Sequence, residues 1–290
     1  MKSKLFILIL MVSVLFYGCQ SAEPTGEIAA TTLPVYEFTC AITEGTGLMV
    51  TRLITENVSC LHDYSLNVRQ VKAAEAAQTI VISGMGLEEF MEDLLTDAPC
   101  VIDSSEGITC LHSHEDHGDH DGHHHEDDPH IWLSPENAMV MAQNICAGLS
   151  RRYPAHQGTF EKNLDALLQK LQALADYGHD ALQELSTREI ITFHDGFAYF
   201  ANCFNLTILE AVEEESGSEA SAAELVHLIG LVQEHRLPAI FTEINGSTSA
   251  PGIIARETGA KTFPLDMAMS QRGYFESMYH NIDMIKEALQ

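Results

Sequence analysis

Short apolar runs alternate with stretches of helical periodicity over the first part of the chain. The β-rich runs cover residues 27–33, 48–54, 79–83 and 100–104, and the helical patterns cover residues 35–45, 67–78 and 87–95. This alternation is typical of βαβ units, in which helices cover a parallel sheet. The segment LSPEN then predicts a helix with Ser134 as N-cap and Pro135 at its first position, continuing to about Arg152. The pattern predicts an N-terminal α/β lobe over residues 27–152.

Residues 156–185 follow a different pattern, with leucine and phenylalanine at helical spacing, polar residues between them and no proline. A single helix of this length would span roughly 45 Å, longer than one small domain. We therefore predict a linker helix over residues 153–186 that joins two lobes. A helical hairpin broken at Gly178 is the alternative.

The alternation of strands and helices resumes after the predicted linker. The β-rich runs cover residues 189–193, 206–209, 239–242 and 261–265, and the helical patterns cover residues 196–204, 221–236, 249–258 and 274–289. We expect a second α/β lobe over residues 187–290. The predicted fold is thus α/β, with two lobes that each contain a parallel sheet flanked by helices, joined by one long helix.

The start of the chain resembles an export signal. Lys2 and Lys4 precede an apolar run that is too short to span a bilayer as a mature helix. Gly18-Cys19 resembles a bacterial lipobox, in which the cysteine is acylated, so we expect a signal peptide over residues 1–18 and a lipid-anchor spacer over residues 19–26. Plain cleavage and a retained anchor are the alternatives. The lipid would hold the protein on the outer face of a bacterial membrane.

Composition and net charge limit the classes of function that fit the sequence. Hydrophobic residues make up 46% of the 290 residues, enough for one large core or two smaller ones. The net charge of −27 argues against nucleic acid as a partner and suits a surface that attracts cations. Six cysteines follow Cys19, and an exported protein could join them in disulfides or bury them as thiols. These cysteines are Cys40, Cys60, Cys100, Cys110, Cys146 and Cys203.

The loop at residues 111–128 is dense in metal-binding side chains. Between His112 and Asp128 it contains seven histidines and seven carboxylates but almost no apolar residue. It cannot bury enough surface to offset the entropy of ordering, so we expect an auxiliary loop that captures metal ions weakly. Mixed imidazole and carboxylate ligands favour a transition ion, most often zinc. The histidines are His112, His114, His117, His120, His123, His124 and His125.

Four residues outside this loop are candidate ligands for a tighter metal site. His62, His194 and Asp266 each follow a predicted strand, and His130 closes the acidic loop. Ligands in open α/β sheets bind beyond the carboxyl ends of the strands, and three imidazoles with one carboxylate suit tetrahedral zinc. One histidine or aspartate after a strand is more often a capping or loop residue, so the four count as a set. Five further histidines on predicted helices read as surface positions: His156, His179, His227, His235 and His280.

The segments CLHDYSL, DPHIWLSPENA, TFHDGFAYFA and ETGAKTFPLD resemble, in order and spacing, the zinc and manganese solute-binding lipoproteins of ABC transporters. The resemblance covers nearly the whole mature chain. It implies one metal ion held between two lobes by His62, His130, His194 and Asp266, and delivery of that ion to a membrane permease with its ATPase. Manganese members usually carry glutamate at the third position, so His194 favours zinc, with manganese as the alternative.

Some residues depart from the family pattern or extend it. Leu61 stands where a proline often precedes the first ligand, and Met267 stands where a proline often follows the last. Glu243 matches a family glutamate that lies near the metal, as a supporting partner or substitute ligand. Cys60 could bind metal through its thiolate, although a structural or disulfide role is the preferred interpretation.

Two other classes of protein remain as alternatives. A zinc hydrolase would need an open coordination position and a general base, and no H-E-x-x-H motif is present, so we expect no enzyme. A metal-buffering surface adhesin could use the same fold without delivering metal. We expect a monomeric binding protein whose transported ligand is Zn²⁺.

Overall fold

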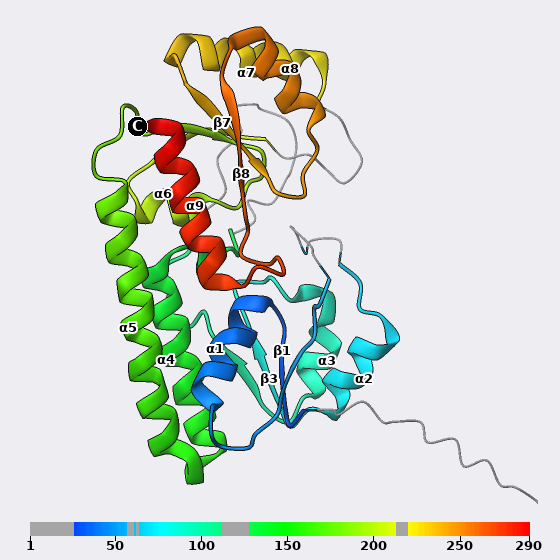
Figure 1. Cartoon of the computed structure of the whole chain (residues 1–290). Helices are drawn as coiled ribbons and strands as arrows, with labels where there is room; N and C mark the ends of the chain where they lie inside the picture. Colours follow the sequence, from blue (N-terminus) through cyan, green and yellow to red (C-terminus); the bar gives the residue numbers. More distant parts are fainter. Residues whose placement is uncertain (1–25, 57–60, 62–63, 112–127, 213–219) are drawn as a thin grey trace, which may run out of the picture.

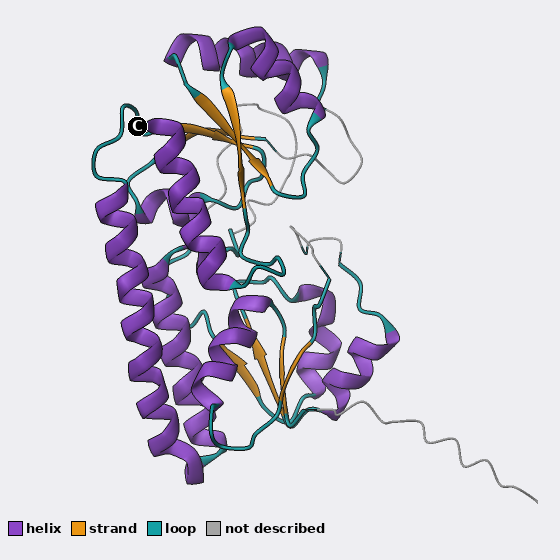
Figure 2. Cartoon of the chain, viewed as in Figure 1, coloured by secondary structure: helices purple, strands orange, loops and turns teal. Residues whose placement is uncertain are grey.

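The computed structural model describes residues 26–56, 61, 64–111, 128–212 and 220–290. Within those residues, eight strands form two separate parallel sheets of four strands each. Figure 2 shows the sheets as two groups of strands, each with its own helices. The predicted architecture of two α/β lobes is confirmed.

The N-terminal sheet has the strand order β2-β1-β3-β4. Its strands are β1 (Ile28–Ala30), β2 (Val50–Arg52), β3 (Thr79–Ile82) and β4 (Val101–Asp103). They are connected by the helices α1 (Leu33–Thr43), α2 (Val68–Ala76) and α3 (Glu92–Asp97). A 3₁₀ turn (Glu89–Met91) precedes α3. Ile28 and Ala30 pack into a cluster with α1, whereas Ala29 packs on the other face with residues of α2. Burial on both faces explains why β1 is a continuous apolar run.

The C-terminal sheet has the strand order β6-β5-β7-β8. Its strands are β5 (Glu189–Thr192), β6 (Thr207–Ala211), β7 (Ala239–Glu243) and β8 (Lys261–Leu265), and its helices are α6 (Ala198–Cys203), α7 (Ala222–His235), α8 (Ser249–Thr258) and α9 (Tyr274–Leu289). Ile190 and Ile191 of β5 are both buried but belong to different apolar clusters. This sheet is therefore also covered on two faces.

One long helix connects the lobes, and it follows a helix that packs on the N-terminal lobe. A short 3₁₀ turn (Ile131–Leu133) leads into α4 (Pro135–Arg152), whose N-cap Ser134 accepts a hydrogen bond from the backbone N–H of Asn137 at 3.2 Å, as the sequence predicts. After a second 3₁₀ turn (Pro154–His156), α5 (Gln157–Ala181) runs for 25 residues, or about 37 Å. It packs against α1, α4 and α9, and Figure 1 shows it passing beside both lobes. The hairpin alternative is wrong, because α5 continues through Gly178.

One apolar cluster extends through both lobes, from Ile28 of β1 to Leu289 at the end of α9. Trp132 is 1% exposed, and its indole N–H donates to the carbonyl of Met267 at 2.8 Å. The carbonyl of Trp132 in turn accepts from the hydroxyl of the buried Tyr274 at 2.9 Å. Since Trp132 precedes α4 and the other two residues follow β8, these bonds join the lobes directly.

Several sequence predictions concern cysteines and the chain start. Among the cysteines in the described part of the chain, Cys40, Cys100, Cys146 and Cys203 carry free thiols and not disulfides. Of these four, Cys146 is buried and the others are partly exposed, so the buried-thiol interpretation holds at Cys146 alone. Cys60, the signal peptide and Cys19 lie outside the described residues. None of the helices that the structure describes combines the length and apolar character needed to cross a membrane.

Candidate metal centre

His130 is held in place by the carboxylate of Asp128. The His130 side chain is 2% exposed, and its Nδ1 lies 2.8 Å from Asp128 Oδ1, which also accepts the backbone N–H of His130 at 2.9 Å. An ionised carboxylate only accepts hydrogen bonds, so this contact assigns the imidazole proton to Nδ1 and leaves a lone pair on Nε2. Metal-binding histidines are commonly oriented in this way.

His194 has a carboxylate partner of its own. It follows β5, and its Nδ1 lies 3.3 Å from Oε1 of Glu243, the last residue of β7. The strands β5 and β7 are paired at Thr192 and Phe241, so His194 and Glu243 are each two residues beyond the same rung of the sheet. The sheet register therefore brings this imidazole and this carboxylate together.

The two imidazoles are neighbours. The ring centroids of His130 and His194 are 5.3 Å apart in an edge-on arrangement. Gly196 permits this approach, because a Cβ atom there would lie 2.9 Å from His130 Nδ1 and 2.7 Å from His194 Cδ2. No larger residue fits without displacing the rings.

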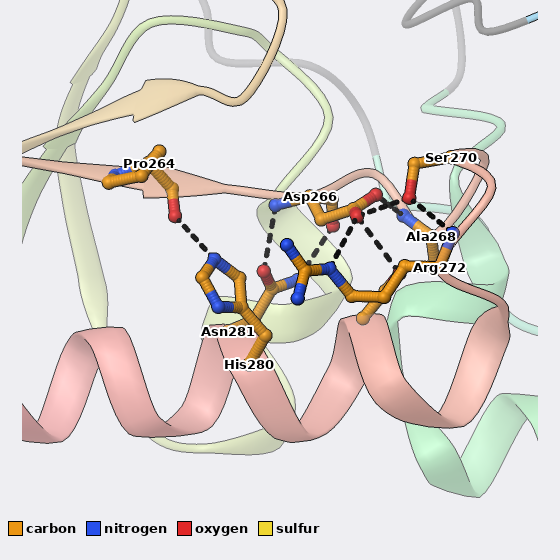
Figure 3. Close-up of polar contacts among 8 residues, drawn as sticks. Pro264, Asp266, Ala268, Ser270, Arg272, His280 and Asn281 are labelled. Atoms are coloured by element: carbon orange, nitrogen blue, oxygen red, sulfur yellow. Dashed lines mark hydrogen bonds and ion pairs between the residues drawn. The ribbon is translucent and has the colours of Figure 1, made fainter.

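Asp266 follows β8 and is 3% exposed. Its backbone is fixed on both sides by Asn281, which accepts from the Asp266 N–H at 2.8 Å and donates to the Asp266 carbonyl at 2.7 Å. Its Oδ2 accepts from the hydroxyls of Ser270 at 2.6 Å and Ser277 at 3.0 Å, with the Arg272 Nε at 3.7 Å. Figure 3 shows much of this network at the start of α9. A metal ion would share Asp266 with these groups.

The structure tests the geometry of only part of the predicted ligand set. It brings His130, His194 and Glu243 together, and the residue after Asp266 reaches the same place, since a Cβ on Gly196 would also lie 2.6 Å from Met267 Cε. His62 and the histidines of the acidic loop lie outside the described residues.

Sequence reasoning missed two residues of the site. Asp128 was counted only as part of the acidic loop, although its position two residues before His130 is the signal that marks it as a partner. Gly196 was interpreted as the opening of a helix, whereas α6 begins at Ala198 and Gly196 lies against both imidazoles. The carboxylate of Asp128 is buried against His130, and a buried carboxylate of this kind can balance the charge of a cation.

The chain is similar to known metal-binding proteins over most of its length. The chain is 29% identical over 307 residues to the zinc-binding lipoprotein AdcA of Streptococcus pneumoniae serotype 4, covering 99% of this chain and 61% of that protein. The chain thus spans less than two thirds of the length of that relative. A crystal structure of ZnuA is 30% identical with a TM-score of 0.78, covering 91% of this chain and 99% of that one.

A second solved structure, the metal-dependent lipoprotein YcdH from Bacillus subtilis, is 27% identical with a TM-score of 0.76, covering 90% of this chain and 98% of that one. The family model described as zinc-uptake complex component A, periplasmic, matches residues 28–288. That match runs from β1 to the end of α9 and includes both lobes, the paired imidazoles and the linker helix. The chain belongs to this family of zinc-uptake components.

Proposed function

We propose that the chain is an extracytoplasmic solute-binding protein that captures Zn²⁺ between its two lobes and delivers it to the permease of an ABC transporter. The observation that carries the proposal is the pair of neighbouring imidazoles of His130 and His194, each with a carboxylate against Nδ1. His62 and Asp266 complete the proposed ligand set. Glu243 supports His194 and could replace a missing ligand.

Zinc is favoured over manganese because of the donor atoms. Neutral imidazole suits zinc, whereas carboxylate, carbonyl and water oxygens suit manganese. The proposed set contains three imidazoles and one carboxylate, which give tetrahedral zinc its usual ligands. As a member of a family of uptake components, the chain is a binding protein and not an enzyme.

Calorimetric titration of His194→Ala with zinc tests the site. Removal of one of four ligands from a preformed shell is expected to weaken the tightest binding at least tenfold while leaving the fold intact. His227→Ala is the matched control, since the His227 side chain is 59% exposed on α7 and contacts Glu210. Equal affinities for His194→Ala and the unmodified protein would exclude His194 from the shell.

The acidic loop is proposed to hold additional ions loosely. Deletion of residues 112–126 should lower the number of zinc ions bound at saturation and leave the tightest dissociation constant nearly unchanged. The reason is that a tight site needs ligands held by an ordered scaffold, as His130 and His194 are. Loss of the tightest binding on deletion would assign the site to the loop.

Lipidation at Cys19 and delivery to a permease need tests in cells. Cys19→Ser should move the protein from the membrane fraction to the soluble extracytoplasmic fraction. Cells that carry His194→Ala should grow poorly when zinc is limiting, and added zinc should restore growth. Growth equal to that of cells with the unmodified protein would favour a buffering or adhesive role over delivery.

A further inference from the structure

A second group of metal-binding side chains lies away from the interlobe imidazoles. Glu136 in the first turn of α4, His179 near the end of α5 and Cys203 at the end of α6 each offer one ligand atom, and these atoms lie within 4.8 Å of one another. Glu136 Oε1 lies 3.2 Å from His179 Nε2, and Glu136 Oε2 accepts from the Cys203 thiol at 2.7 Å. The fold thus brings together three donors from separate parts of the sequence.

Close packing of α5 against the end of α6 determines where these three side chains lie. A Cβ atom on Gly178 would lie 2.2 Å from Cε1 of Phe204, so only glycine allows the helix to pass here. The next residue, His179, contacts the Phe204 ring edge-on with centroids 5.4 Å apart. On the other side, the buried N-cap Ser134 donates to Glu136 Oε2 at 3.0 Å. Both the imidazole and the carboxylate are therefore oriented by neighbours outside the group.

We propose that Glu136, His179 and Cys203 form a second metal site, which binds zinc or a chemically similar divalent ion such as cobalt or cadmium. The thiolate, the imidazole Nε2 and one carboxylate oxygen would supply three ligands, and water would supply the fourth. Zinc takes these three donor types in tetrahedral sites. This proposal goes beyond the proposed transport function and does not depend on it.

The distances allow such an ion with small adjustments. Tetrahedral zinc with bonds of about 2.0–2.3 Å places its ligand atoms about 3.3–3.5 Å apart. Glu136 Oε1 lies 3.2 Å from the imidazole and Glu136 Oε2 lies 2.7 Å from the thiol. Because all three ligand atoms lie within 4.8 Å of one another, small side-chain rotations bring one carboxylate oxygen into this range of both. The ion would take the place of the thiol proton, which leaves to solvent as the thiolate forms. The side chains of His179 and Glu136 are 50% and 46% exposed, so an ion can reach them.

A metal ion at this second site would connect helices that are adjacent to the interlobe histidines in the sequence. Glu136 belongs to the helix that follows the interlobe His130, and Cys203 belongs to the helix that follows His194. An ion bound by both would connect α4 to α6 across α5, on the elements that position the two imidazoles. We therefore expect bound metal to stabilise the protein against unfolding.

Titration of the protein with Co²⁺ distinguishes this site from the other metal sites. A cobalt–thiolate bond gives a charge-transfer absorption in the near ultraviolet, whereas the proposed interlobe ligands and the acidic loop offer imidazoles and carboxylates. Cys60 lies close to His62 in the sequence, so it is replaced by serine in every protein compared. The protein with this replacement alone should develop the thiolate band, Cys203→Ser should abolish it, and Cys40→Ser should retain it as the matched control, since Cys40 also has a free thiol.

His179→Gln provides an independent test, because its half-exposed side chain can change without loss of the fold. This variant should need at least tenfold more cobalt to reach the same thiolate absorption. The proposal is overturned if the protein with Cys60→Ser alone shows no thiolate band, or if the band survives in Cys203→Ser. An unchanged titration of His179→Gln overturns it as well, even where Cys203→Ser does not fold. Each result is separate from zinc binding at His194, whose ligand set has no thiol.

Discussion

Replacement of Gly196 by alanine would add one methyl group between the two imidazoles of the interlobe site. The new Cβ would lie 2.9 Å from His130 Nδ1, 2.7 Å from His194 Cδ2 and 2.6 Å from Met267 Cε. The methionine can move aside, since its side chain is flexible. The imidazoles cannot move freely, because His130 is hydrogen-bonded to Asp128 and the His194 ring lies between His130 and Glu243.

The size of the effect follows from these contacts. To restore ordinary van der Waals separation, the His130 ring must shift by about 0.5 Å and the His194 ring by about 0.7 Å. Together these shifts exceed the tolerance of about 0.5 Å within which a metal site keeps its geometry. We expect Gly196→Ala to weaken the tightest zinc binding about tenfold or more, equivalent to about 1.4 kcal/mol. The fold should persist, because the backbone at Gly196 does not have a positive φ.

Competition with a chelator of known affinity would measure the change, and thermal unfolding without metal would report on the fold. Gly252→Ala in α8 is the control, since a Cβ there has no atom within 4 Å. The reasoning is refuted if Gly196→Ala is folded and binds zinc as tightly as the unmodified protein. Equal weakening in both glycine variants would refute it too.

Three further predictions concern single residues. Asp128→Asn keeps the shape of the side chain but removes the charge that supports the neighbouring imidazole, and should weaken zinc binding about 10-fold to 100-fold in the same competition assay. Burial raises the pKa of Glu88 from 4.5 to about 7, so the native state keeps a proton that the unfolded chain loses. The free energy of unfolding should therefore fall by on the order of 3 kcal/mol as the pH rises from below 4.5 to above 7. Urea unfolding of Glu88→Gln should show a flatter dependence of this free energy on pH. The same dependence in the variant and the unmodified protein would contradict a raised pKa of Glu88. Gly178→Ala should destabilise the protein by about 1–3 kcal/mol in urea unfolding, because its methyl group would clash with Phe204. Gly158→Ala in the same helix has open space around it and should stabilise the protein by up to about 1 kcal/mol. A similar change in the free energy of unfolding for both variants would rule out the clash.

The hydrophobic pattern predicted the fold well, because the spacing of apolar residues within each strand or helix shows which of its faces is buried. The two sheets, the helix that begins after Ser134 and the long helix α5 all depend on local periodicity and capping. The position of Gly178 within α5 raised the alternative of a break, since glycine lowers helix propensity. The structure gives the reason for this glycine, which is close contact with Phe204 at the end of α6.

The site was less predictable, because its details depend on contacts between segments. Strand ends marked His194 and Asp266 as candidates, but the partnership of His194 with Glu243 depends on the pairing of β5 and β7. In the same way, His179 was interpreted as an ordinary surface residue. The sequence does not show that Glu136 and Cys203 lie beside it, because the three residues come from different helices, α4, α5 and α6, that meet only in the folded protein.

The apolar cluster that runs from β1 to α9 has a consequence for how the protein unfolds. Trp132 and Tyr274 belong to this one cluster, and Leu289 at the end of the chain is fully buried in it. The backbone carbonyl of Leu289 also accepts the N–H of Ser186 at 2.7 Å, just before β5. Unfolding of either half should therefore expose apolar surface in the other half. Despite two separate sheets, calorimetry should record one cooperative transition, and loss of the last few residues should lower its midpoint for the whole molecule.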